Sequence, residues 1–237
     1  MAPPASSPAA AHIGIVACSA EGAALCYRTI CVEAAARMGP HDHPEVSMHT
    51  HALARYVPPI DAGDWEGVAA LMLSSAEKLA AAGADFLICP DNTIHQAMPW
   101  VRARSPLPWL HIAEVAADEA VRRGFRRIGI TGTSWLSEGP VYPDALEARG
   151  LEWRRPPAED RETVGRIIMD ELVYGRFEPA SIEAVRGVIA RLAKEGCDAV
   201  VLGCTELPLI LDDGNSPLPT LDSTRLLARA ALDRALG

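Results

Sequence analysis

The feature that most constrains the fold of this chain is an internal repeat. Residues 78–88 read KLAAAGADFLI and residues 191–201 read RLAKEGCDAVV, so the two segments match at a constant offset of 113 residues. Nearer the start, residues 13–15 (IGI) recur as residues 128–130 at an offset of 115. Any two helix–glycine–strand junctions resemble one another, but two matches in the same order at nearly the same offset favour tandem halves. The sequence therefore predicts two similar lobes.

Strands and helices alternate along the whole chain. Short apolar runs predict strands at residues 12–17, 45–51, 85–89, 109–112, 127–131 and 198–202. Helical patterns with capping residues or glycine stops predict helices over residues 19–38, 65–82, 115–123, 161–174, 181–195 and 226–236. Strands that alternate with helices of this length are typical of a parallel α/β sheet.

We therefore expect an α/β fold of two pseudo-symmetric Rossmann-like lobes, each with a mainly parallel sheet. Residues 12–112 and 219–237 are predicted to form the first lobe, with the final helix returning to it, and residues 113–218 the second. The active site is expected in the cleft between them. Residues 1–11 are rich in Ala, Pro and Ser without Lys or Arg, so we expect a disordered tail rather than a secretory signal.

Composition narrows the class of protein. The net charge is -9 and aromatic residues make up 5% of the chain, which argues against nucleic-acid and anionic-membrane partners. No apolar run approaches the roughly 20 residues of a membrane-spanning helix. Six cysteines occur without a CxxC pair, as is typical of a reducing compartment. We expect a cytoplasmic enzyme with a small-molecule carboxylate or amino-acid substrate, and we leave a homodimer open.

Distinctive polar residues follow one strand in each predicted lobe. In the first lobe the strand leads into residues 89–95 (CPDNTIH), and in the second into residues 203–206 (GCTE). Ligands of open α/β sheets bind beyond the carboxyl ends of the strands. The repeat offset of 113 places Asp91 opposite Cys204, so the sequence predicts a carboxylate and a thiol across one cleft.

Two proton-transferring groups on opposite sides of one carbon suit inversion of a stereocentre, because one removes a proton and the other delivers one. We expect burial to raise the pKa of Asp91 and a helix N-terminus to lower the pKa of Cys204. The same offset places Asn92 opposite Thr205. These two residues and Thr93, with nearby backbone amides, are candidates to hold a substrate carboxylate.

The same segments resemble the aspartate/glutamate racemase family, a cofactor-independent group that also contains hydantoin racemases, maleate isomerases and arylmalonate decarboxylases. Its first motif, Cys-Asn-Thr with a His two residues on, is matched by residues 91–93 and His95, and its Gly-Cys-Thr-Glu motif by residues 203–206. Residues 132–133 and 222–224 extend the resemblance over nearly the whole chain. The resemblance implies a PLP-independent and metal-independent racemase or epimerase, which uses two-base proton transfer at the alpha carbon of an amino acid of aspartate or glutamate type.

One position departs from the family pattern, because Asp91 stands where the first catalytic cysteine is expected. We expect Asp91 to be the acid/base partner of Cys204. Cys89 is the alternative partner if the loop curls, since a shift of two residues moves an extended chain by several Å. A third possibility is that Cys204 acts alone, in one-sided isomerase or decarboxylase chemistry on a related dicarboxylate.

The remaining candidates are substrate ligands near the strand ends. The full set of expected substrate-binding residues is Ser19, Asn92, Thr93, Thr133, Thr205, Glu206 and Arg55. Arg161 and Arg166 are further candidates to grip a distal carboxylate, because arginine binds carboxylates in a bidentate manner. Glu206 either orients a catalytic group or occupies the first turn of a helix, and His95 is expected to be structural.

Two rival types of site were weighed. Alternating histidines share one face of a strand and allow a metal site, but we expect a polar loop and strand there. These residues are His41, His43, His49 and His51, with Asp42. PLP requires a Schiff-base lysine, and the chain's two lysines, Lys78 and Lys194, lie at predicted helix ends. We expect neither a metal nor a cofactor. A cytosolic sensor that binds a small ligand is the non-enzyme alternative.

Overall fold

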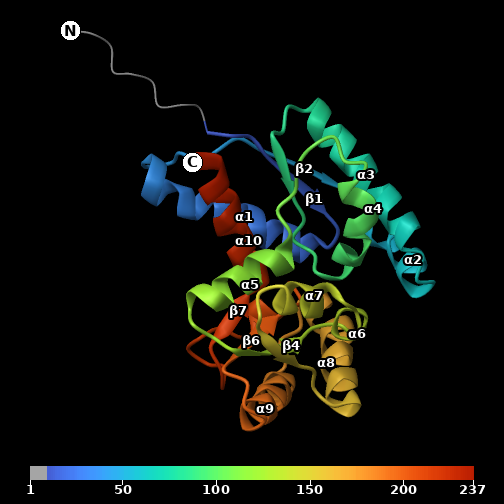
Figure 1. Ribbon diagram of the computed structural model, residues 1–237, viewed down its shortest axis with the longest axis vertical. Coiled ribbons are helices and arrows are strands. Elements are labelled where there is room, and N and C mark those ends of the chain that lie inside the picture. The colour runs from blue at the N-terminus through green and yellow to red at the C-terminus, as the bar shows by residue number, and fades with distance from the viewer. Residues whose placement is uncertain (1–9) are drawn as a thin grey trace.

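The computed structural model describes residues 10–237 and shows two α/β lobes, each built on a parallel sheet (Figure 1). The first sheet has the order β2-β1-β3 and contains β1 (Ile13–Ala17), β2 (Val46–Thr50) and β3 (Phe86–Ile88). The second has the order β5-β4-β6-β7 and contains β4 (Arg127–Thr131), β5 (Glu152–Arg154), β6 (Ala199–Leu202) and β7 (Thr220–Asp222). The expected fold class is confirmed.

The internal repeat of the sequence is also a repeat in strand pairing. Ile13 pairs with Phe86 in the first sheet, and Ile128 pairs with Ala199 in the second. Ile128 lies 115 residues after Ile13 and Ala199 lies 113 residues after Phe86, which are the two offsets found in the sequence. In the first lobe, Leu87 of β3 makes a single parallel bridge to Trp109. This bridge lies where β7 pairs with β6 in the second lobe. Both sheets therefore have the same strand order and register.

Helices cover both faces of each sheet, so the strands β1, β3 and β6 are buried and apolar throughout. In the first lobe, α1 (Ala20–Met38) and α10 (Ser223–Leu236) cover one face, and α3 (Trp65–Ala81) and α4 (Met98–Arg102) cover the other. In the second, α5 (Ile112–Arg122) and α7 (Val141–Glu147) cover one face, and α8 (Ala158–Asp170) and α9 (Pro179–Lys194) cover the other. The short helices α2 (Val57–Asp61) and α6 (Ser134–Glu138) lie near the strand ends.

The two lobes are joined by α5 and α10. Figure 1 shows α5 between the lobes, with α10 alongside α1. Within the segment from residue 219 that we expected in the first lobe, Thr220–Asp222 pairs with β6 as the edge strand of the second sheet. The chain crosses at Asp222, whose side chain caps α10 by accepting the N–H of Arg225. The final helix does pack on the first lobe.

Residues 1–9 of the expected tail lie outside the described residues. Ala11 is part of the fold, since its N–H donates to the carbonyl of Ala235 at 2.9 Å. Within residues 10–237, no helix combines the length and the apolar character needed to cross a membrane.

Two expected elements differ in the structure. The strand expected at 109–112 is reduced to the bridge between Leu87 and Trp109, because α5 begins at Ile112 with His111 as its cap. The helix expected at 161–174 is α8, which ends at Asp170 and is followed by the 3-10 helix Leu172–Tyr174.

Candidate active site

A cavity of about 270 Å³ opens between the lobes, at the carboxyl ends of β1, β3, β4 and β6. This is where parallel α/β sheets place their ligands. Its polar lining residues are Cys18, Ser19, Asp91, Asn92, Thr93, Thr133, Cys204, Thr205 and Glu206. The structure thus brings together the expected acid/base residues and every expected substrate-binding residue except Arg55.

Asp91 is half-buried and leads from β3 into the 3-10 helix Thr93–Ala97. Its Oδ1 atom accepts a hydrogen bond from the N–H of Ile94 at 3.1 Å. Burial raises the pKa of Asp91 above its ordinary value, the Ile94 amide opposes this, and the charge of Glu206 adds to it. A raised pKa brings a carboxyl group closer to neutrality, where a general acid or base works best.

Cys204 follows β6, and its Sγ atom donates a hydrogen bond to Oε2 of Glu206 at 2.8 Å. Burial raises the pKa of Cys204 well above its ordinary value, and the charge of Glu206 raises it further. The expected lowering of this pKa is therefore wrong. The chain beyond Cys204 forms only the 3-10 helix Leu207–Leu209, so no long helix directs its N-terminus at the sulfur. The raised pKa keeps the thiol protonated at neutral pH.

Glu206 is the centre of a buried hydrogen-bond network. Its Oε2 atom also accepts a hydrogen bond from Oγ1 of Thr205 at 2.9 Å. The Thr205 Oγ1 atom lies 3.3 Å from Oγ of Ser19 in the other lobe. Ser19 caps α1 by accepting the N–H of Gly22. A Cβ atom at Gly22 would lie 2.7 Å from both the carbonyl oxygen of Pro90 and the side chain of Thr205. Glycine at this position therefore lets the first turn of α1 pack against the segments that contain Pro90 and Thr205.

Asn92 is buried and its amide is held on both sides by the protein. Its Nδ2 atom donates to Oγ of Ser223 at 3.1 Å, and its Oδ1 atom accepts from the hydroxyl of Tyr142 at 2.6 Å. Ser223 in turn donates to the carbonyl of Leu202 at the end of β6. Although it lines the cavity, Asn92 therefore braces one lobe against the other.

His95 fixes the backbone of Asp91, in keeping with its expected structural role. Its Nδ1 atom lies 2.6 Å from the carbonyl oxygen of Asp91, and its Nε2 atom accepts the N–H of Ile112 at 3.3 Å. Because Nε2 is an acceptor, Nδ1 carries the proton and the ring is neutral. Burial lowers the pKa of His95 well below its ordinary value, which keeps the ring neutral.

Thr93 and Thr133 bring hydroxyls from the two lobes together. Their Oγ1 atoms lie 3.2 Å apart. Thr133 also caps α6 by accepting the N–H of Leu136 at 3.3 Å. A hydroxyl donates one bond and accepts two, so both retain capacity toward the cavity.

Cys18 is a cavity residue that the sequence analysis missed. Burial raises the pKa of its thiol well above the ordinary value, and the charge of Asp91 raises it further. It directly follows β1, so the rule that drew attention to the ends of the other strands would have found it. Cys89, the alternative partner, is wholly buried in the apolar core of the first lobe and does not line the cavity.

The arginines expected to grip a distal carboxylate lie elsewhere. Arg55 is exposed and donates to Nδ1 of His51 at 3.0 Å. Arg161 donates to a backbone carbonyl, and Arg166 is exposed with Glu171 as its neighbour at 3.9 Å. Among residues 10–237, no lysine, arginine or histidine lines the cavity. Its charged lining groups are the carboxyls of Asp91 and Glu206.

Two of the histidines considered as metal ligands, His49 and His51, contact other side chains of the protein. His49 is hydrogen-bonded to Oγ of Ser75 at 2.9 Å, and the His51 ring packs edge-on against it. In the part of the chain that the structure describes, no group of three or more His, Cys, Asp or Glu residues is arranged to hold a metal ion.

The model of the Asp/Glu/Hydantoin racemase family matches residues 14–231. The chain belongs to this family. The resemblance seen in the motifs is thereby confirmed, and the site described above lies within the matched region. Racemases are isomerases, so the expected class of enzyme is confirmed at the level of the family.

Two solved structures share the fold over nearly the whole chain, and a further relative is similar in sequence. A Yersinia pestis protein assigned as an Asp/Glu racemase is 31% identical, with a TM-score of 0.88 over 96% of this chain and 100% of that protein. An aspartate racemase homologue from Pyrococcus horikoshii is 27% identical, with a TM-score of 0.83 over 95% of this chain and 99% of that one. The broad specificity amino-acid racemase RacX of Bacillus subtilis is 22% identical over 82% of this chain and 83% of its own length.

Proposed function

We propose that this chain is a cofactor-independent racemase or epimerase that moves protons at the carbon next to a substrate carboxylate. The observation that carries the proposal is that Asp91 and Cys204, at matching positions of two repeated lobes, line one cavity. Membership of a racemase family supports it. In the proposed reaction the two groups act on opposite faces of one carbon.

In one direction, the Asp91 carboxylate takes the proton and the electron pair of the C–H bond passes into the adjacent carboxylate. The Cys204 thiol then delivers its proton to the opposite face, which leaves a thiolate and a protonated Asp91. In the other direction the thiolate takes the proton and Asp91 delivers one. Exchange with solvent resets the pair between turnovers. Hydrogen-bond donors aimed at the carboxylate stabilise the charge that develops there.

The substrate carboxylate is proposed to bind the hydroxyls of Ser19, Thr93, Thr133 and Thr205. They surround the cavity near the N-terminus of α1, and helix N-termini favour anions. The acidic amino acids named for the family are the first substrates to test, and the name of the Bacillus subtilis relative recommends a broader panel.

No lysine is placed to form a Schiff base in this cavity. Lys78 is exposed on α3, where its Nζ atom donates to Oγ of Ser74, and Lys194 is exposed at the end of α9. This arrangement supports proton transfer by Asp91 and Cys204 themselves. A cytoplasmic location and a homodimer stay predictions from the sequence.

One-sided chemistry is the second candidate, and the replacement of the family's first cysteine by Asp91 favours it. An isomerase or decarboxylase would use Cys204 alone to protonate a carbanion.

A sensor would bind a ligand without using the thiol, so Cys204→Ser would leave its affinity largely intact.

The test is to supply each enantiomer of a substrate panel separately in deuterated water and to follow the alpha proton by NMR and the configuration by chiral chromatography. The proposal expects inversion accompanied by deuterium at the alpha carbon. Inversion that retains the original proton, or carbon dioxide release with no inversion of any amino acid, would contradict it.

A further inference from the structure

The cavity has a second wall that the proposed proton transfer does not use. Besides the polar residues, its lining contains large apolar side chains from both lobes. These are Leu53, Val57, Ile60, Trp135, Ile168, Met169, Val173 and Tyr174. They come from η1 (Leu53–Arg55) and α2 in the first lobe, and from α6, α8 and the 3-10 helix Leu172–Tyr174 in the second.

These apolar residues share the cavity with the carboxyls of Asp91 and Glu206, and no cationic side chain among residues 10–237 lines it. A substrate bearing a distal carboxylate would bring a second negative charge into a cavity that already holds two carboxyls and no cation. Moving an ionised carboxylate from water to the apolar part of this lining is strongly unfavourable. An uncharged apolar group, by contrast, gains free energy when it leaves water for such a wall.

Resting on the proposed function, we infer that the group on the reacting carbon of the substrate is uncharged and apolar, aliphatic or aromatic, rather than a second carboxylate. The substrate carboxylate binds the hydroxyl groups near α1, and its apolar group lies against the side chains of α2, α8 and the 3-10 helix Leu172–Tyr174. A cavity of about 270 Å³ is close to the smaller ligand pockets and suits a molecule of amino-acid size.

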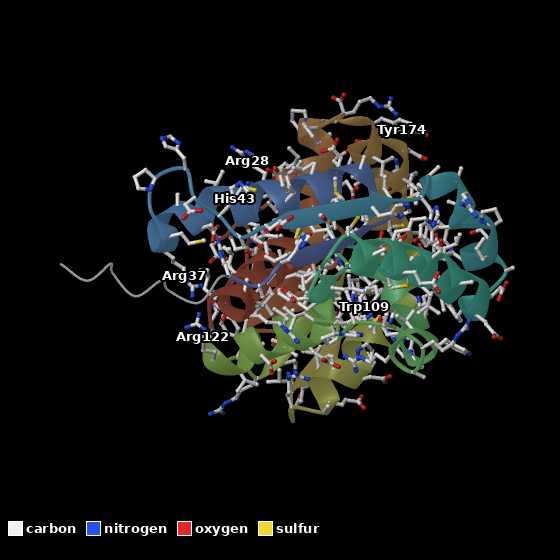
Figure 2. All side chains as sticks on the ribbon, turned by 90° about the horizontal axis from the view of Figure 1, so that it is seen from above. Arg28, Arg37, His43, Trp109, Arg122 and Tyr174 are labelled. Carbon is white, nitrogen blue, oxygen red and sulfur yellow. The ribbon has the colours of Figure 1, made fainter. Side chains whose placement is uncertain are left out.

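The rim of the cavity is apolar as well. Leu53 is 40% exposed and Tyr174 is 74% exposed, although both line the cavity. Figure 2 shows Tyr174 at the outer edge of the molecule. Two large apolar side chains, one from each lobe, therefore flank the entrance, which lets a substituent longer than that of leucine extend outward between them.

Leucine and aspartate form a matched pair for the test, because their side chains have the same number of non-hydrogen atoms and the same branching but differ in charge. Deuterium incorporation at the alpha carbon is measured for both enantiomers of each, with phenylalanine, glutamate and the corresponding 5-substituted hydantoins completing the panel. We expect kcat/KM for the apolar member of each pair to exceed that for the acidic member by at least about 10-fold.

Faster exchange of aspartate or glutamate would overturn this inference and leave the proposed function standing. Exchange in no member of the panel would overturn the proposed function, and this inference with it. The two failures are therefore distinguishable in a single set of measurements.

A substitution in the wall gives an independent test. Met169→Lys places an ammonium group on the apolar side of the cavity without altering Asp91 or Cys204, and Val121→Lys on the exposed face of α5 is its control. We expect Met169→Lys to shift the leucine-to-aspartate ratio of kcat/KM toward aspartate by about 10-fold or more, and Val121→Lys to leave it unchanged. An unchanged ratio in a Met169→Lys enzyme with wild-type circular dichroism would contradict the inference.

Discussion

The two lobes present different chemical groups at matching positions of one repeated framework. In the first lobe, Asp91 is a carboxyl that accepts the backbone N–H of Ile94. In the second, Cys204 is a thiol that donates to the carboxylate of Glu206. The strand register is repeated while the hydrogen-bond roles are reversed, so the same backbone supplies a proton acceptor on one side of the cavity and a proton donor on the other.

Burial raises the pKa of both groups, but it moves one pKa toward neutral pH and the other away from it. It raises the pKa of Asp91 from the carboxyl range toward neutrality, and it raises the pKa of Cys204 further away from neutrality. The Cys204 thiol therefore stays protonated at neutral pH. A protonated thiol can deliver a proton but cannot remove one, so we expect the two enantiomers to be processed at unequal rates.

The largest effect is expected at the second lobe. Cys204→Ser keeps a small side chain but replaces the thiol with a hydroxyl that is far less acidic, so turnover should fall by about 10³- to 10⁴-fold. Cys31→Ser, on α1 and outside the cavity lining, is the matched control and should retain activity. The assay is inversion of a single enantiomer followed by chiral chromatography. Near-normal turnover of Cys204→Ser would remove the thiol from the mechanism.

A smaller loss is expected at the first lobe. Asp91→Asn preserves the shape but removes the titrating proton, so turnover should fall by about 10²-fold or more with substrate affinity little changed. Asp61→Asn, exposed on α2, is the control. Steady-state kinetics separate the two parameters. If Asp91→Asn is active while Cys89→Ala is inactive, Cys89 is the partner and the first motif is aligned wrongly.

Asp91→Cys would sharpen the comparison by making the two lobes alike. A thiol at this position restores the family's cysteine pair, so we expect the variant to retain or regain inversion, with kinetic constants for the two enantiomers closer to each other than in the wild type. Measuring kcat/KM in both directions checks this. A variant that is folded but inverts neither enantiomer would show that the framework requires a carboxyl here.

The pH dependence of stability tests the raised pKa of Asp91. Because its folded-state pKa lies above the unfolded-state value of about 3.9, the contribution of this carboxyl is complete below that value and is lost as pH rises through the folded-state pKa. The free energy of unfolding of the wild type, relative to Asp91→Asn, should therefore fall as pH rises from about 4 toward neutrality. Urea titrations at several pH values measure it. A relative stability that does not change with pH would contradict the raised pKa.

The smallest effect concerns the brace between the lobes. Tyr142→Phe removes the hydroxyl that donates to Asn92, so the free energy of unfolding should fall by about 0.5 to 1.5 kcal/mol. Tyr27→Phe, on the exposed side of α1, is the control and should be close to neutral. Chemical denaturation gives both values. Equal effects of the two changes would mean that the brace does not stabilise the lobe contact.

Much of the fold was readable because its signals are local. The helix–glycine–strand junctions predicted the repeat, and the strand at Arg127–Thr131 has the expected bounds. The missed elements, such as β5, β7 and α7, are only 3, 3 and 7 residues long, so each shows too few positions for a sequence pattern. β7 is a strand of three residues whose pairing with β6 decides its identity.

The chemistry of the site was less readable than its location. The sequence placed Asp91 and Cys204 together, but the pKa of the thiol is raised by burial and then by the carboxylate of Glu206, whose Oε2 atom lies 2.8 Å from the sulfur. Spacing along the chain reveals neither of these. Arg55 was expected in the cavity because of its charge, yet it points to His51. Asn92 has the residue type of a ligand, but its amide joins the lobes.

The most direct test of opposite-face proton transfer is deuterium exchange by Asp91→Asn and Cys204→Ser, measured with each enantiomer alone. Each variant keeps one of the two groups, so each should exchange the alpha proton of one enantiomer with retention of configuration and fail to exchange the other. The account predicts that the two variants lose opposite enantiomers. Loss of the same enantiomer in both, or wild-type exchange by Asp91→Asn, would contradict it.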